Sequence, residues 1–187
     1  MPKGGKGKGK GKKGKGKAPG GPNPRTLPAN IRAAANGGDV AAVEQWLNEG
    51  GHVDAIHCSP AYPDRSRTLL MLASRNGHEI FAGSLIQRGA LVNLQDSNGY
   101  TALMFAAGHG HQFVMQRLLW AGADPSIRNS LGISPLDWIE ERHAHSPCPG
   151  HAECIRLIER HFETRPSSPP TEMTGGASYL AKSELLV

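Results

Sequence analysis

Cysteine and long apolar segments are scarce in this sequence. Its three cysteines, Cys58, Cys148 and Cys154, do not make the disulfide framework of a small secreted protein. No apolar run reaches the length of about 18 residues that a membrane-spanning helix needs. The N-terminus also lacks the apolar segment that follows the basic start of a secretory signal. These absences favour an intracellular protein, cytoplasmic, nuclear or both.

Catalytic motifs are missing as well. The chain contains no serine nucleophile elbow, no phosphate-binding loop and no paired carboxylates at a persuasive spacing. The Lys-Gly alternation near the N-terminus is not a P-loop, which needs G-x-x-x-x-G-K-[ST] after a strand. We therefore expect a protein that is not an enzyme and that uses no cofactor.

Positive charge is concentrated at the N-terminus. The formal net charge is +5, but residues 1–17 hold eight lysines and no acid, which leaves 13 basic and 16 acidic residues in the rest of the chain. Residues 1–27, rich in Gly and Lys, cannot bury a core, and we expect a disordered basic tail. Residues 164–187 contain prolines and small polar residues, which predict a second flexible tail.

The basic tail has three competing interpretations. Its flexible lysines would attract RNA, DNA or an acidic membrane surface without reading base sequence. They would serve nuclear import equally well, or only keep the protein in solution. The lysines concerned are Lys3, Lys6, Lys8, Lys10, Lys12, Lys13, Lys15 and Lys17.

The middle of the chain repeats itself. Residues 68–93 align with residues 101–126 at an offset of 33 residues, with Thr over Thr, Gly-His over Gly-His and Gly-Ala over Gly-Ala. Each unit contains two short segments of helical apolar periodicity that are separated by a glycine. A period in this range is typical of stacked supersecondary units, so each unit is predicted to be two helices and a turn.

These units closely resemble the ankyrin repeat, whose pattern runs D-x-x-G-x-T-P-L-H, then A-A-x-x-G-H, then L-L-x-x-G-A-D. The matching residues are Asp96, Gly99, Thr101, Leu103, Ala106, Ala107, Gly110, His111, Leu118, Leu119, Gly122, Ala123 and Asp124. The resemblance implies an all-α solenoid of paired antiparallel helices with finger loops. Thr68 and Thr101 are placed to cap first helices.

More diverged units flank the two central ones. We expect an ankyrin domain over residues 28–163, with four repeats at about 28–62, 63–95, 96–128 and 129–163. The connection after the first repeat is lengthened by six residues, and an insert, RHAHSPCP, delays the last helix.

Two local features predict modest stability. The family's motif histidine, which hydrogen-bonds back toward the capping threonine, is replaced by Met71, Met104 and Asp137, so those bonds are expected to be absent. Gly83 falls inside a second helix and should cost about 1 kcal/mol relative to alanine.

Ankyrin arrays are binding scaffolds whose fingers and first helices line a concave groove. The family's variable groove positions fall here on Arg65, Arg67, Arg75, Asn76, Ser97, Asn98, Tyr100, His109, Leu131, Ile133, Glu141 and Arg142. An apolar anchor at Tyr100, Leu131 and Ile133, flanked by arginines, would suit a protein or peptide partner with acidic and hydrophobic residues. The alternative for any one of these residues is ordinary solvated surface. We expect a monomer.

Three further features stand outside the groove. Trp46 occupies a core position of the family pattern, whereas Trp120 replaces a usually solvated one and is a candidate for a contact on the opposite face. The insert carries His143, His145, Cys148, His151 and Cys154, which are residue types that bind zinc. Because the cysteines are not a C-x-x-C pair and His151 belongs to the Gly-His turn, we expect no metal.

Overall fold

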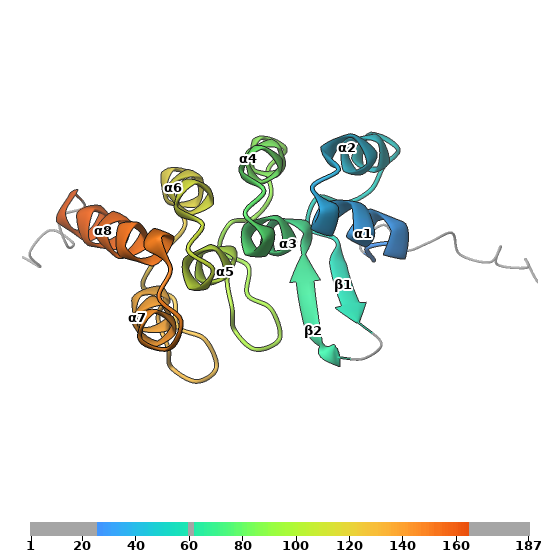
Figure 1. Ribbon diagram of the computed structural model, residues 1–187. Coiled ribbons are helices and arrows are strands. Elements are labelled where there is room, and N and C mark those ends of the chain that lie inside the picture. Colours follow the sequence, from blue (N-terminus) through green and yellow to red (C-terminus); the bar gives the residue numbers. More distant parts are fainter. Residues whose placement is uncertain (1–25, 60–61, 165–187) are drawn as a thin grey trace, which may run out of the picture.

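The structure is a computed structural model that describes residues 26–59 and 62–164, and the side chains of residues 26–57 and 66–164. Eight helices occur in this part of the chain: α1 (Ala29–Gly37), α2 (Val40–Asn48), α3 (Leu69–Asn76), α4 (Glu79–Gln87), α5 (Ala102–Gly108), α6 (Gln112–Trp120), α7 (Pro135–His145) and α8 (Pro149–Thr164). They form successive pairs. The first helices, α1, α3, α5 and α7, lie in one row and the second helices in another (Figure 1). The predicted all-α solenoid is confirmed.

One continuous core runs through the stack. Leu69, Leu103 and Ile139, from three successive first helices, are all buried, and so are Val114 and Leu118 from a second helix. Alanines at the centre of the first helices, such as Ala73 and Ala106, are fully buried and let neighbouring helices approach closely. Each pair therefore covers the apolar face of the next. Trp46 packs partly buried against this core, as expected.

The lengthened first finger is a β-hairpin. Strands β1 (Ile56–Ser59) and β2 (Tyr62–Thr68) are antiparallel, with Ile56 opposite Thr68 and an irregular register between His57 and Ser59. The sequence predicts a longer connection but no strands, because prolines and polar residues hide the alternation that marks a strand. Strand pairing satisfies backbone groups of the paired residues in this connection.

The folded unit begins earlier than residue 28. Thr26 forms a parallel bridge with Ile56, and the Leu27 N–H donates to the Ile56 carbonyl at 3.0 Å. The side chain of Leu27 is buried in the core. The tail boundary predicted at residue 27 was therefore wrong for these two residues, since an apolar side chain next to β1 gains from burial.

Three first helices begin with a hydroxyl cap. The Thr68, Thr101 and Ser134 hydroxyl oxygens accept the backbone N–H of the residue three positions later, at 3.2 to 3.3 Å. The caps expected at Thr68 and Thr101 are thus confirmed. Each satisfies one of the backbone donors left free at a helix start.

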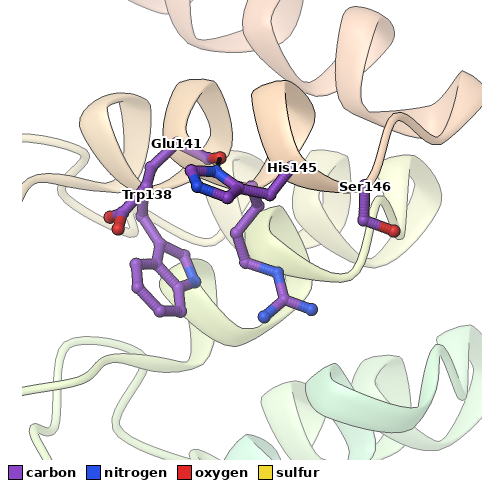
Figure 2. Close-up of a pocket in the computed structure, with 5 residues that line it drawn as sticks. Trp138, Glu141, His145 and Ser146 are labelled. Atoms are coloured by element: carbon purple, nitrogen blue, oxygen red, sulfur yellow. Dashed lines mark hydrogen bonds between the residues drawn. The ribbon is translucent and has the colours of Figure 1, made fainter.

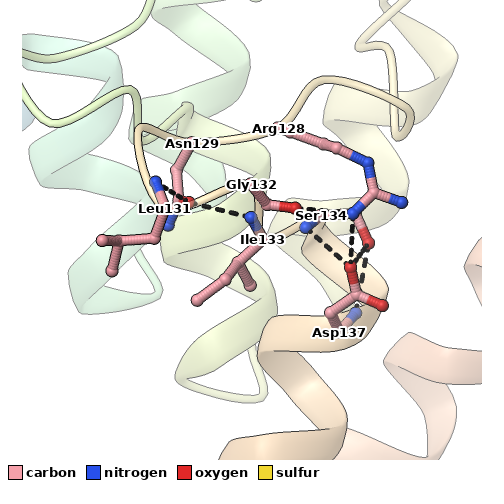
Figure 3. A network of polar contacts seen from close by, with 7 residues as sticks. All are labelled: Arg128, Asn129, Leu131, Gly132, Ile133, Ser134 and Asp137. Atoms are coloured by element: carbon pink, nitrogen blue, oxygen red, sulfur yellow. Dashed lines mark hydrogen bonds and ion pairs between the residues drawn. The ribbon is translucent and has the colours of Figure 1, made fainter.

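The hydrogen bond from the motif histidine position back to the capping residue was expected to be absent at three places. This expectation was wrong at two of them. At the start of α7, the Asp137 carboxylate accepts the Ser134 N–H at 3.0 Å and the Ser134 hydroxyl at 2.8 Å, and it pairs with Arg128 at 2.9 Å (Figure 3). Those two bonds from Ser134, first among the causes, lower the pKa of Asp137. At α3, the Met71 sulfur takes the same place as a weak acceptor of the Thr68 N–H, at 3.5 Å. A carboxylate therefore completes a capping box where the family has histidine.

The Gly-His turns join successive pairs. The Nε2–H groups of His78 and His111 donate to carbonyls at the end of the preceding first helix, at 2.9 Å to Asn36 and 3.0 Å to Arg75. His151 makes the equivalent bond to Gly108 at 3.3 Å. These histidines are structural, as expected from the repeat pattern.

Gly83 provides a test of the stability argument. A Cβ built on Gly83 would meet Arg117 no closer than 3.4 Å, which is ordinary contact. Gly83→Ala should therefore raise the free energy of unfolding by about 1 kcal/mol, because alanine loses less backbone entropy in a helix. Urea denaturation measures this change.

Gly89, just after the same helix, is the matched control. A Cβ there meets nothing within 4 Å, but the backbone has φ +85°. Gly89→Ala should lower stability by about 1 kcal/mol through backbone strain alone. Equal effects of the two substitutions would contradict this account.

Candidate functional site

Aromatic side chains gather on the row formed by the first helices α1, α3, α5 and α7, which we call the inner row. Phe105 on α5 and Trp138 on α7 lie 33 residues apart, which is one repeat, so they occupy equivalent places on neighbouring helices. Tyr100, from the finger before α5, has its ring centroid 5.8 Å from that of Phe105 and 5.4 Å from that of Trp138. We call these three residues the aromatic floor.

Arginines surround the aromatic floor. The Arg67 guanidinium lies over the Phe105 ring, 4.8 Å from its centroid, and the Arg142 guanidinium lies 5.7 Å from the centroid of Trp138. Contacts of this kind hold a cation by the negative face of the ring. The charged groups are thus placed by the same side chains that form the floor.

Together these residues line one open cavity of about 380 Å³, which we call the groove pocket. Its lining residues are Arg67, Arg75, Asp96, Asn98, Tyr100, Phe105, His109, Trp138 and Arg142. They come from the end of β2, from α3, from the finger before α5, from α5 and its C-terminal cap, and from α7. The pocket therefore spans the second, third and fourth repeats.

The acidic residue of the pocket has a structural task. The Asp96 carboxylate is buried and accepts the N–H groups of Asn98 and Tyr100, both at 2.9 Å. Asn129 does the same one repeat later for Leu131 and Ile133, at 2.9 and 3.0 Å (Figure 3). Asp96 thus shapes the finger that presents Tyr100.

Glycine makes room for the indole of the aromatic floor. Trp138 Nε1 lies where a Cβ on Gly108 would be, so the ring packs directly on the α5 backbone. Gly108 is itself buried. A side chain at this position would exclude the indole from its place in the pocket.

The surroundings of His109 disfavour its charged form. Burial, first among the causes, lowers the pKa of His109 from its usual value, and the nearby charges of Arg142 and Arg75 lower it further. Its Nδ1–H donates to the Phe105 carbonyl at 3.0 Å, which partly opposes that shift. The positive charge of the pocket therefore comes from its arginines.

Half of the predicted groove residues meet in this pocket. They are Arg67, Arg75, Asn98, Tyr100, His109 and Arg142. Glu141 instead lines a neighbouring pocket together with Trp138, Arg142, His145 and Ser146, and Figure 2 shows Trp138 and Glu141 projecting from α7 beside it.

The remaining predicted residues lie elsewhere. The Asn76 side chain donates to the Asn36 side-chain oxygen at 3.2 Å, and the Ser97 hydroxyl accepts the Ser66 N–H at 3.3 Å. Leu131 is 75% exposed at its finger tip, and Ile133 is half-buried. The ring contacts of Tyr100 are made with Phe105 and Trp138. The side chain of Arg65 falls outside the described residues, as do the eight tail lysines.

Sequence reasoning missed Phe105 and Trp138. Both are large apolar residues within helices, so the sequence pattern assigns them to the hydrophobic core. The 33-residue offset that places Trp138 over Phe105 was available, and with Gly108 it would have indicated an open place on the inner helices for a large ring.

The histidines and cysteines of the insert are divided between two helices and the connection between them. The insert lengthens α7 to His145, and α8 then begins at Pro149, so Cys148 lies in the connection. Cys154 is buried, and burial raises the pKa of its thiol to about 12. Within the part of the chain that the structure describes, no group of three or more His, Cys, Asp or Glu side chains is placed to hold a metal ion.

Comparison with protein families agrees with the helix pairs and their Gly-His turns. A family model of ankyrin repeats, in three copies, matches residues 31–129, more than half of the chain. The chain belongs to the ankyrin-repeat family. The fourth helix pair, α7 and α8, continues the ankyrin stack beyond the matched residues.

Comparison with curated proteins finds no match. None of the helices in residues 26–59 and 62–164 has the length and apolar character to cross a bilayer.

The packing of Trp138 on Gly108 can be tested directly. Gly108→Ala should displace the indole and lower the free energy of unfolding by about 1–3 kcal/mol, as overpacking does. Near-ultraviolet circular dichroism and tryptophan fluorescence should both change. Gly37→Ala, where a Cβ meets nothing within 4 Å, is the control and should leave both spectra as they are. A Gly108→Ala protein with unaltered spectra would show that Trp138 does not lie on α5.

Proposed function

We propose that this ankyrin-repeat protein is a non-enzymatic adaptor that binds a protein partner through the groove pocket. Ankyrin repeats are generally protein–protein interaction modules. The observation that carries the proposal is the cluster of Tyr100, Phe105 and Trp138 beneath arginines, in one open cavity on the inner row of helices. Aromatic residues and arginine are the types that supply most binding energy at protein interfaces.

The charge of the pocket indicates the character of the partner. Three of its lining residues are arginines, and its one carboxylate is buried in hydrogen bonds to the finger backbone. An opposite charge on the partner would speed association and fix its orientation. The partner segment is therefore expected to carry acidic residues beside an apolar one. In this role the protein acts as a monomer in the cytoplasm or the nucleus.

Substitutions in the pocket test the adaptor function. Tyr100→Ala should reduce capture of the main cellular partner by at least about tenfold, because an interface anchor is worth more than about 1.4 kcal/mol. Affinity capture from extracts of the protein's own cells, followed by mass spectrometry, measures the loss.

Trp120→Ala is the matched control, since Trp120 is 77% exposed at the end of the second helix α6. It should leave capture unchanged. Loss of the partner with Trp120→Ala and retention with Tyr100→Ala would place the interface on the second helices instead.

The lysine-rich tail suggests a rival function. Eight lysines in residues 1–17 would bind nucleic acid or another polyanion through phosphate contacts that weaken steeply with salt. Deleting residues 1–24 should leave the main partner bound at ordinary salt if the adaptor function holds. Complete loss on deletion, together with a steep salt dependence of the full chain, would favour a nucleic-acid-associated factor in which the repeats only position the tail.

A further inference from the structure

We propose that the groove pocket recognises the doubly charged phosphoryl group of a phosphorylated peptide, held between the guanidinium groups of Arg75 and Arg142. This inference rests on the proposed function and adds the chemistry by which the partner is chosen. It follows from the charge of the pocket, from the places of its arginines, and from the floor beneath them.

Two positive charges of the pocket lack a counterion among the side chains that the structure describes. Arg75 and Arg142 form no ion pair with any carboxylate among residues 26–57 and 66–164, whereas Arg117, Arg128 and Arg156 each do. A phosphorylated side chain carries about −1.5 to −2 charges at neutral pH and matches two guanidinium groups. A single carboxylate would leave one of them unbalanced.

The two arginines approach from opposite sides. Arg75 belongs to the last turn of α3 and Arg142 to α7, and α5 packs between these helices. His109, at the end of α5, is influenced by the charges of both arginines, so all three lie close together. A guanidinium binds two oxygens of a phosphate in its plane, and a tetrahedral phosphoryl group has enough oxygens to accept both planes.

The aromatic floor adds a place for the rest of the peptide. Tyr100 and Trp138 pack edge to face, and the Arg142 guanidinium lies beside the indole. An apolar side chain next to the phosphorylated residue would cover these rings and remove water around the charges. Charge pairs strengthen when water is excluded. The occupant is thus a peptide that places a phosphoryl group beside an apolar residue.

A pair of small probes separates charge from shape. Phenyl phosphate and phenyl sulfate have nearly the same shape, but the first is doubly and the second singly charged near pH 7.5. Calorimetric titration of the full chain at constant ionic strength should show phenyl phosphate binding at least about tenfold more tightly. Equal affinities would overturn the proposal.

Two variants assign the binding to the pocket. Arg75→Gln and Arg142→Gln should each weaken phenyl phosphate about tenfold, because each removes a charge-assisted bidentate contact. Arg88→Gln is the control, because Arg88 lies among the second helices and does not line the pocket. It follows α4 and donates to Asn48 at the end of α2. The lysine tail is present in every protein, so it cannot produce a difference between them.

The arginines also have a competing structural role, which is to offset the negative partial charge at the ends of α3 and α7. In that case both variants would melt at lower temperature but bind phenyl phosphate like the wild type. That result would overturn the proposal.

Further probes identify the source of the phosphoryl group. A peptide with phosphoserine beside leucine should bind more tightly than its unphosphorylated form and more tightly than inorganic phosphate, with the excess lost in Arg142→Gln. Inorganic phosphate binding as tightly as the peptide would overturn peptide recognition.

A single-stranded oligonucleotide, whose phosphodiesters are singly charged, should bind Arg142→Gln and wild type alike through the tail. A selective loss of oligonucleotide binding in Arg142→Gln would assign the pocket to nucleic acid instead.

These outcomes are separable from the proposed function. If the phosphorylated probes fail while Tyr100→Ala still abolishes partner capture, the groove binds a protein without phosphoryl recognition and only this further inference is wrong. If Tyr100→Ala has no effect on capture, the adaptor proposal itself is contradicted.

Discussion

The apolar face that one helix pair cannot cover alone is the constraint on which this molecule depends. Buried residues such as Leu69 and Leu103 come from successive first helices and meet only because the pairs stack at a fixed spacing. The same spacing brings Phe105 and Trp138 side by side, with Tyr100 between them. The proposed binding surface thus arises from the same packing that stabilises the array.

The pocket also depends on contacts that do not themselves touch a partner. Asp96 fixes the finger that carries Tyr100, and Gly108 leaves the space that the Trp138 indole occupies. The capping box of Ser134 and Asp137 fixes the start of α7, which carries both Trp138 and Arg142. Preorganisation of this kind lowers the entropy lost when a partner binds.

The sequence predicts the fold and six of the nine residues that line the groove pocket. Period and motif residues were sufficient for the helix pairs and for the Thr68 and Thr101 caps, because these follow from local chemistry. The hairpin of the first finger was missed since its strands lack alternation. Phe105 and Trp138 were missed because large apolar residues within helices are expected to be core, and Phe105 is indeed buried there while its ring also lines the pocket. The Asp137 capping box was missed because the motif expects histidine.

The groove pocket draws its lining from three repeats, and this has a consequence for how the array unfolds. Stability in a stack of repeats is a sum over neighbours, so the outer pair α7 and α8 can separate while the middle remains folded. A ligand that touches both α3 and α7 is lost as soon as that outer pair opens. A ligand bound in the groove pocket would therefore couple the unfolding of the last repeat to that of the second. Repeats two to four would then unfold as one cooperative unit.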